Sequence, residues 1–356
     1  MPTINKNNYI AIAKAIGIIL MVVGHSGCPS IISRFLYTFH MPLFFFCSGY
    51  LYKEVTDTET YKKYAKRKIK GLYYPYLKWS VLFLLLHNLF CRVNIYNSIT
   101  HSSYYDYEDY IRQLLRTIVM SDYELLLRPF WFIKALLLAS IGVASISVLQ
   151  KYYFKNINKI QLLFLFHILT GISKFLPSIP IIGDISIPLF GIVYFYTGLL
   201  LNENKHYLNA SLSILIGTFI IVLIGCHLYG SVIDMRYTTV TNYIPYYFLS
   251  ICGVIMTFIV SKLLERTSIK TWFYYIGNHT MPILALNLLA LKIGNLIKIW
   301  YYDLPIEILS SYTIIGDYNK FFWVLYTIIG ICFPLIIHSI HKRYYTKFNN
   351  YLGIIK

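Results

Sequence analysis

The sequence predicts an all-α fold, a polytopic transmembrane helical bundle of about ten spans with its N- and C-termini in the cytoplasm. Three observations predict it. Of the 356 residues, 57% are hydrophobic and only 13% are charged, and the mean hydropathy is +0.56, as is typical of membrane proteins. Apolar segments long enough to cross a hydrocarbon core of ~30 Å recur along the whole chain. Basic residues are concentrated in alternate connecting segments, which indicates a defined orientation in the membrane.

Ten hydrophobic segments account for the expected spans, although the fifth is short and the ninth contains polar residues. They are residues 9–27, 34–52, 71–91, 130–149, 160–176, 184–201, 208–228, 243–261, 273–291 and 321–341. The first span resembles a signal peptide but has no A-x-A-like cleavage site, so we interpret it as an uncleaved helix. We expect one transmembrane domain over residues 1–341 and a short basic cytoplasmic tail over residues 342–356.

The charges of the connecting segments give the orientation. If the N-terminus is inside, the inner segments hold 19 Lys and Arg with five acidic residues, and the outer segments hold ten of each. Cytoplasmic loops of membrane proteins are enriched in Lys and Arg, so both termini are expected in the cytoplasm. The net charge of +17 is therefore a topology signal, and we expect the lipid bilayer as a partner and no nucleic acid.

Two further features bear on the class of protein. In the outer segment 92–128, apolar residues recur at helical spacing from Ile111 to Val119, which predicts an amphipathic helix at the outer interface. The six cysteines form no C-x-x-C pair, so neither a metal motif nor a redox motif is expected.

The first span carries two ionisable residues, Lys14 and His25, separated by ten mostly apolar residues. At about 100° per residue, eleven steps return to nearly the same helix face and place the two groups about 16 Å apart along it. Ionisable groups inside a bilayer are costly and are functional candidates by default. A cation near one end of the helix and a proton-transfer group near the other suit a reaction with a long anionic donor.

A second histidine lies in the run Phe39-His40-Met41-Pro42 that opens the second span. With the N-terminus inside, His25 and His40 lie near the outer ends of successive spans joined by a short turn, so the two side chains can approach each other. Neutral imidazole accepts a proton near physiological pH, which makes both residues candidates for a general base. A structural role, as a partner of a backbone carbonyl or at the wet interface, stays open for each.

The first inner loop is strongly basic and includes Lys66, Arg67 and Lys70. Such a loop is either a positive-inside anchor beside anionic lipid or a phosphate-binding rim for a nucleotide-bearing donor. Trp131 and Lys134 open the fourth span. They are either a membrane-interface pair, with the lysine reaching outward, or part of the wall of an internal cavity.

Together these features resemble the acyltransferase-3 family of integral-membrane acyltransferases, and within it the fucose 4-O-acetylase-like branch. The resemblance rests on motifs in about the first 135 residues. They are Lys14 and His25 in an R/K-x10-H arrangement, Phe39-His40-Met41-Pro42 leading to Ser48-Gly49-Tyr50, the basic stretch around Arg67 and Lys70 before Pro75, and Trp131-Phe132.

The resemblance implies a ten-helix domain in a bacterial inner membrane. Such a domain moves an acetyl group from cytoplasmic acetyl-CoA to a hydroxyl of a carbohydrate acceptor, either a cell-envelope glycan or an exported one. Acetyl-CoA is then a co-substrate, and no bound cofactor is expected. Both a monomer and a homo-oligomer remain open.

The resemblance also implies roles for individual residues. His25 acts as general base or accepts the acyl group itself, and His40 assists it. The residues expected to bind the acyl donor are Lys14, Lys66, Arg67 and Lys70. The residues expected to position the acceptor are Ser48, Trp131 and Lys134.

The chain departs from the family pattern in three places. The family commonly has an Asp three residues before the Arg/Lys, where this chain has Ala11. An Arg often found a little earlier is also missing, with Lys6 and Asn7 nearby instead, and the usual R-x-x-R becomes Arg67-x-x-Lys70. Lysine lacks the bidentate fork of arginine, so a phosphate contact at this position is looser. Two other interpretations therefore stay open. One is a glycan-lipid transporter or flippase, which ought to show inverted repeats or paired broken helices. The other is an inactive family member in a polysaccharide-export assembly, which Ala11 keeps open.

Overall fold

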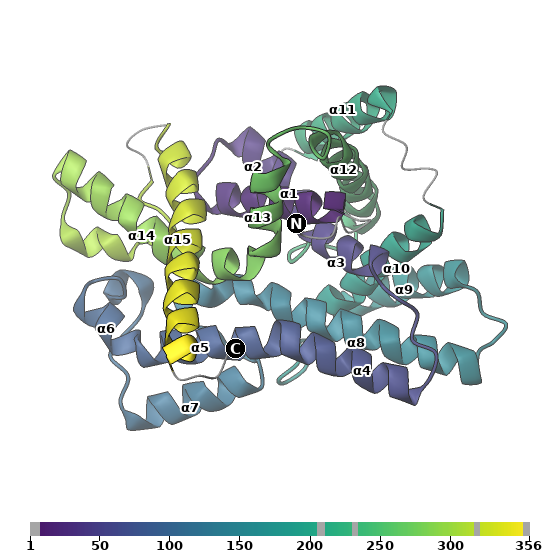
Figure 1. Cartoon of the computed structure of the whole chain (residues 1–356), viewed down its shortest axis with the longest axis horizontal. Helices are drawn as coiled ribbons and strands as arrows, with labels where there is room; N and C mark the ends of the chain where they lie inside the picture. Colours follow the sequence, from purple (N-terminus) through teal and green to yellow (C-terminus); the bar gives the residue numbers. More distant parts are fainter. Residues whose placement is uncertain (1–7, 205–210, 230–233, 317–320, 352–356) are drawn as a thin grey trace.

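The computed structural model describes residues 8–204, 211–229, 234–316 and 321–351 of the chain (Figure 1). Apart from one isolated β-bridge between Ile179 and Gly183, the regular structure of these residues is helical, so the all-α prediction is confirmed. Seven helical stretches of the described chain are long and apolar enough to cross a membrane, by length and composition. The chain is therefore a polytopic helical membrane protein. The seven stretches are Asn8–His25, Ser30–Tyr50, Leu125–Tyr152, Leu212–Tyr229, Tyr243–Leu264, Thr280–Tyr302 and Phe322–Tyr345.

The α-helices have the following bounds in chain order. They are α1 (Asn8–His25), α2 (Ser30–Tyr37), α3 (His40–Tyr50), α4 (Thr58–Lys68), α5 (Tyr74–Leu85), α6 (His87–Arg92), α7 (Tyr107–Ile118), α8 (Trp131–Tyr152), α9 (Lys159–Ser173), α10 (Ser186–Glu203), α11 (Leu212–Tyr229), α12 (Tyr243–Leu264), α13 (Lys270–Asn278), α14 (Thr280–Tyr302) and α15 (Phe322–Tyr351). A π-helical turn, η1 (Ile69–Tyr73), joins α4 to α5, and short 3₁₀ segments are η2 (Ser98–Thr100), η3 (Leu125–Phe130) and η5 (Ile306–Ser310).

The seven stretches are fewer than the ten spans expected from the sequence. The other three expected segments are also helical but do not meet this standard of length and hydropathy. α5 and α9 are too short, and the polar residues Asn202 and Glu203 at the end of α10 lower its mean hydropathy. The expected domain limit at residue 341 falls inside α15, which continues without a break to Tyr351. The cytoplasmic position of the termini stays a prediction.

The expected ninth span, residues 273–291, has the wrong boundaries. The chain breaks at His279 and then forms α14, which runs eleven residues past position 291. The expected segment stopped one residue before Lys292, and a lysine rarely lies inside a membrane helix. In the structure Lys292 is buried, and its ammonium donates to the carbonyl oxygens of Leu309, Ser310 and Ser311 at 3.0, 3.2 and 2.6 Å. These hydrogen bonds compensate for burial and let the helix continue.

The core of the bundle includes a close contact between α3 and α10. A Cβ added at Gly49 would lie 1.9 Å from the carbonyl oxygen of Phe195, and one added at Gly198 would lie 2.2 Å from that of Phe46. Only glycine allows two backbones to approach so closely, as is common in membrane bundles. α1 lies beside this pair and contacts α2, α3, α12, α13, α14 and α15. The first span is thus surrounded by protein, which is where an intramembrane Lys and His are tolerated.

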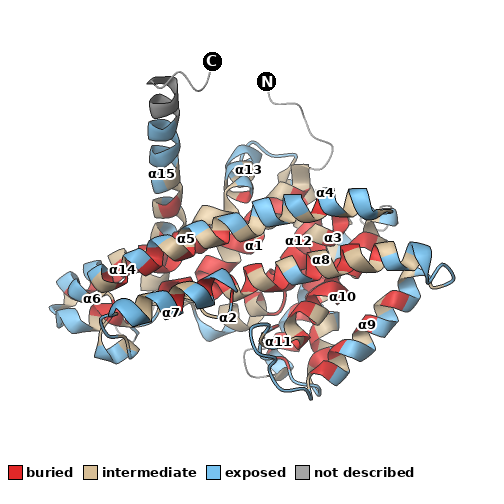
Figure 2. Cartoon of the chain, turned by 90° about the horizontal axis from the view of Figure 1, so that it is seen from below, coloured by how far each residue is buried: buried red, intermediate tan, exposed pale blue. Residues whose placement is uncertain are grey.

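The periphery is formed by helices whose apolar residues are exposed. Figure 2 shows exposed residues along α7, α9 and α11, while the buried residues gather around α3, α8, α10 and α12. The expected amphipathic helix is confirmed as α7, and its apolar residues Ile111, Leu115 and Ile118 are exposed. Exposed apolar faces on a chain of this class are lipid-facing surfaces. The position of α7 at the outer interface stays a prediction.

Candidate active site

A cavity of about 500 Å³ lies between α1, α3, α4, α8 and α14. It brings together three residues that the sequence analysis selected from separate segments, Lys14 of α1, Ser48 of α3 and Arg67 of α4. Most of the remaining wall is apolar and is formed by residues such as Phe132 and Leu136. A mainly apolar cavity with a few convergent polar groups is the usual form of a small-molecule site.

One end of the cavity is basic, and the ring of Tyr64 organises it. Tyr64 is buried, and both the guanidinium of Arg67 and the ammonium of Lys68 lie 5.4 Å from its ring centroid. Lys53 adds a third cation to the lining. Burial, and then the neighbouring Arg67, lowers the pKa of Lys68 to about 8. Three cations at one mouth of an apolar cavity are suited to a phosphorylated ligand.

Local sequence explains how α4 presents these cations. Asp57 caps the helix by accepting from the backbone N–H of Thr60 at 2.8 Å, and the Thr60 side chain completes a capping box. The α-helix then gives way to the π-turn η1 before Pro75, which lacks an N–H for the regular ladder. Gly71 lies in this turn and lines the cavity, and a Cβ added to it would meet open space.

Lys14 lies in the wall of the cavity beside α3. Its charge interacts with the thiol of Cys47, and Cys47 and Ser48 both line the cavity with it. Ala11, one turn earlier on α1, lies against α13, where a Cβ on Gly277 would be 1.9 Å from the Ala11 carbonyl oxygen. The position at which the family commonly has an Asp is therefore in a close helix–helix contact.

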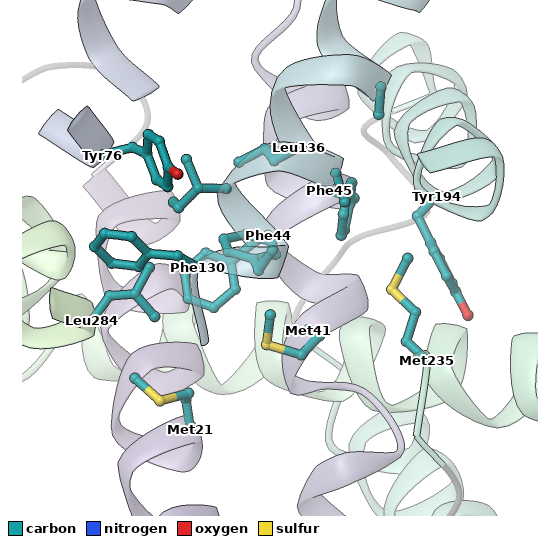
Figure 3. Packing of buried hydrophobic residues seen from close by; sticks show 14 of the residues in the cluster. Met21, Met41, Phe44, Phe45, Tyr76, Phe130, Leu136, Tyr194, Met235 and Leu284 are labelled. Atoms are coloured by element: carbon teal, nitrogen blue, oxygen red, sulfur yellow. The ribbon is translucent and has the colours of Figure 1, made fainter. Parts of the chain in front are cut away.

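The other end of the cavity is closed by apolar side chains. Figure 3 shows Met21, Met41 and Phe44 gathered in this region, and all three line the cavity. Phe132 packs on Phe44 with ring centroids 5.4 Å apart. Met21 lies one helical turn before His25, and Met41 directly follows His40. The cavity therefore ends about one helical turn short of the two histidines, and neither histidine lines it.

The two histidines lie close together beyond this end. His40 is buried, and its Nδ1 donates to the carbonyl oxygen of Leu36 at 2.7 Å. Because a carbonyl can only accept, Nδ1 carries the proton, and in the neutral ring Nε2 has a free lone pair. His25 is partly buried and near enough to interact electrostatically with His40. Tyr37 contacts both helices, since its ring packs edge-on against His40 at 5.0 Å and its hydroxyl donates at 3.4 Å to the carbonyl of Gly24, the residue before His25.

The remaining expected site residues lie outside the cavity lining. Lys66 and Lys70 are exposed on the surface of the basic segment. Lys134 donates to the carbonyl oxygen of Ile181 at 2.5 Å, so its ammonium is directed toward the 174–185 loop. Trp131 is partly buried next to Phe132, with the guanidinium of Arg236 lying 5.8 Å from its ring.

Sequence reasoning missed several lining residues. Lys68 was part of the basic run but was not selected, although it lies one position after Arg67 and faces the cavity. Lys53, at the start of the inner loop, was not selected either, although it lines the cavity. Thr280 and Met281 belong to α14, and the break at His279 that directs them to the cavity was the polar interruption already visible in the ninth segment.

Metal chemistry has no evident site in the part of the chain that the structure describes. No group of three or more His, Cys, Asp or Glu side chains is placed there to hold a metal ion.

The comparisons with known proteins identify the family. The family model described as an acyltransferase domain (Acyl_transf_3) matches residues 7–341, which is nearly the whole chain and includes all the residues of the cavity. No curated protein and no solved structure matches the chain.

Proposed function

The chain belongs to the acyltransferase-3 family of membrane acyltransferases, and on this premise we propose that it moves an acetyl group from cytoplasmic acetyl-CoA to a hydroxyl of a cell-envelope or exported glycan. A bacterial inner membrane is the corresponding location. The fucose 4-O-acetylase-like branch is the part of the family that we propose for it. The observation that carries the proposal is the cavity, which leads from a basic mouth to the foot of a histidine pair.

The donor would bind with its charged part at the basic mouth. Arg67, Lys68 and Lys53 would hold the phosphates, and the exposed Lys66 and Lys70 would raise the local concentration of the anion. The pantetheine arm would follow the apolar cavity past Lys14. Eleven helical steps lead from Lys14 to His25, a rise of about 16 Å, which suits an extended arm with the thioester at its tip.

The chemical step would take place beside the histidines. His25 would take the proton of the acceptor hydroxyl, whose oxygen attacks the thioester carbonyl and forms the ester as the C–S bond breaks. The leaving CoA thiolate would then receive that proton from the imidazolium of His25. His40 has its Nδ1 proton committed to Leu36, so its Nε2 is oriented to help position the hydroxyl or His25. In the covalent alternative, His25 receives the acetyl group first and passes it to the acceptor.

The proposal is tested by mass spectrometry of the host's surface glycan. The strains are wild type, deletion, and deletion complemented with His25→Ala or His101→Ala at matched protein level. His101 is an exposed histidine in the loop after η2 and serves as the matched control. An acetyl-sized increment should vanish in the deletion, return with His101→Ala and stay absent with His25→Ala. Full acetylation with His25→Ala would refute the mechanism, and unchanged acetylation with reduced glycan export would favour the transporter interpretation.

A further inference from the structure

Near Tyr37, two arginines lie over aromatic rings. The Arg236 guanidinium lies 5.8 Å from the ring of Trp131 and 5.5 Å from that of Tyr237, and Arg128 lies 5.2 Å from the ring of Tyr312. We call these five residues the arginine–aromatic mouth. They come from η3 and the start of α8, from the segment before α12 and from the segment after η5. Three separate parts of the chain therefore converge on one exposed surface.

The segment that carries Arg236 is anchored in the bundle. Met235 is fully buried, and Figure 3 shows it beside Tyr194. Asp234 accepts from the backbone N–H of Arg236 at 2.8 Å, and its own backbone carbonyl accepts from the hydroxyl of Thr238 at 2.7 Å. The position of Arg236 is thus set by a buried neighbour and a hydrogen-bonded turn rather than by chance packing of an exposed loop.

The mouth lies next to the proposed reaction centre. Tyr37, whose ring packs against His40, lies near Asp234, Tyr237 and Tyr312. Its backbone carbonyl accepts from the hydroxyl of Tyr246 at 3.3 Å. Tyr37 therefore lies between the mouth and His40, against which its ring packs.

The two guanidinium groups keep hydrogen-bonding capacity. Among the residues that the structure describes, neither Arg128 nor Arg236 forms an ion pair with an acidic side chain. Both guanidinium groups lie over rings, and a guanidinium has five N–H donors in its plane with which to bind an anion. Burial raises the pKa of Tyr312, and the charges of Arg128 and then Arg236 oppose this, which shows that both cations act on the same ring. The pattern is a pair of oriented cations with aromatic surface between them.

We propose that the arginine–aromatic mouth binds the acceptor, and that the acceptor is an anionic glycan that carries carboxylate or phosphate groups. This inference rests on the proposed acyltransferase function and narrows its acceptor class. The arginine edges bind the anionic groups in bidentate fashion, and Trp131, Tyr237 and Tyr312 offer flat apolar faces for sugar rings. A neutral glycan would make use of the rings but would leave two arginines without partners.

The test measures binding of glycans that differ only in charge. The purified full chain in lipid nanodiscs is titrated with hexagalacturonate, with its fully methyl-esterified form and with a glycerol-phosphate oligomer. Charge-assisted hydrogen bonds predict that hexagalacturonate binds at least about tenfold more tightly than the ester. A preference for the phosphate oligomer over hexagalacturonate would assign the anion as phosphate.

Variants connect the preference to the mouth. The double variant Arg128→Gln with Arg236→Gln should bind hexagalacturonate and its methyl ester with equal affinity. The Arg112→Gln variant should keep the preference for hexagalacturonate. Arg112 is the matched control, because it is an exposed arginine of α7 that pairs with Asp109. Acetyl-CoA binding and the melting temperature should be unchanged in all three proteins, which separates a local effect from misfolding.

Two results would overturn the proposal: equal binding of acid and ester by the wild type, or a preference that survives in the double arginine variant. Failure of the proposed function has a different signature. In that case the acid is still preferred through the arginines, but glycan acetylation does not depend on His25.

Discussion

Raising the pH from 7 to 9 is expected to weaken donor binding, and Lys68 is the group responsible. Its ammonium lies at the basic mouth of the cavity, over the ring of Tyr64, and only the protonated form attracts a phosphate. Burial and then Arg67 lower the pKa of Lys68 to about 8 in the free protein. Because bound phosphate favours the charged form of Lys68, the affinity for the donor is highest well below pH 8 and falls as the pH rises through that value.

The size of the effect follows from the titration curve. With a pKa of about 8, Lys68 is charged in about nine-tenths of molecules at pH 7 and in about one-tenth at pH 9. If the complex keeps Lys68 protonated, the apparent dissociation constant rises by about tenfold over this interval, which corresponds to about 1.4 kcal/mol. Arginine stays charged throughout the interval, so Arg67 gives no pH dependence of its own.

The assay is calorimetric binding of desulfo-CoA, which has no thiol to titrate, to the protein in nanodiscs at pH 7, 8 and 9. Wild type should lose about tenfold in affinity from pH 7 to 9, and Lys68→Arg should lose little. Lys70→Arg is the matched control, since Lys70 is exposed and does not line the cavity, and it should behave as wild type. The reasoning would be refuted by a pH-independent wild type or by an equal loss in Lys68→Arg.

Two further predictions concern the cavity and the fold. Gly71→Leu should weaken desulfo-CoA binding at least about tenfold with little change in melting temperature, because Gly71 lines the cavity and an added side chain there would meet no protein atoms. Gly217→Leu, an equally open position of α11 outside the cavity, should bind normally. His87→Ala should destabilise the protein by about 3–5 kcal/mol, seen as a lower melting temperature, since it leaves the buried Glu124 carboxylate without its partner at 3.0 Å. Normal donor binding by Gly71→Leu, or an unchanged melting temperature for His87→Ala, would contradict these arguments.

The sequence was sufficient to predict the helical membrane fold because hydropathy and charge are summed over many residues. It failed where one buried contact decides the outcome. Lys292 carries a charge that normally ends a span, and only the three carbonyls of residues 309–311 explain why α14 continues past it. The break between α2 and α3 at Thr38 and Phe39 was also not visible in the continuous apolar run 34–52.

The candidate site was predictable to the extent that it depends on residue types that are costly in a membrane. Lys14 and His25 stood out for that reason, and the structure places Lys14 in the cavity. The choice among neighbouring cations was not predictable, because Lys66, Lys68 and Lys70 are chemically alike. The turn of α4 and the π-turn that follows decide that Lys68 faces the cavity while the other two are exposed.

The closed end of the cavity bears on how the proposed reaction avoids hydrolysis. Met21 and Met41 separate the donor cavity from the histidines, and Phe44 and Phe132 complete this apolar layer. Methionine is unbranched and adapts its shape, so a thioester arm can displace these side chains without disturbing the helices. In the absence of donor the layer would keep water on the histidine side away from the cavity. The thioester would then be shielded from that water until the arm displaces the layer and reaches His25, which limits loss of the acetyl group to water before transfer.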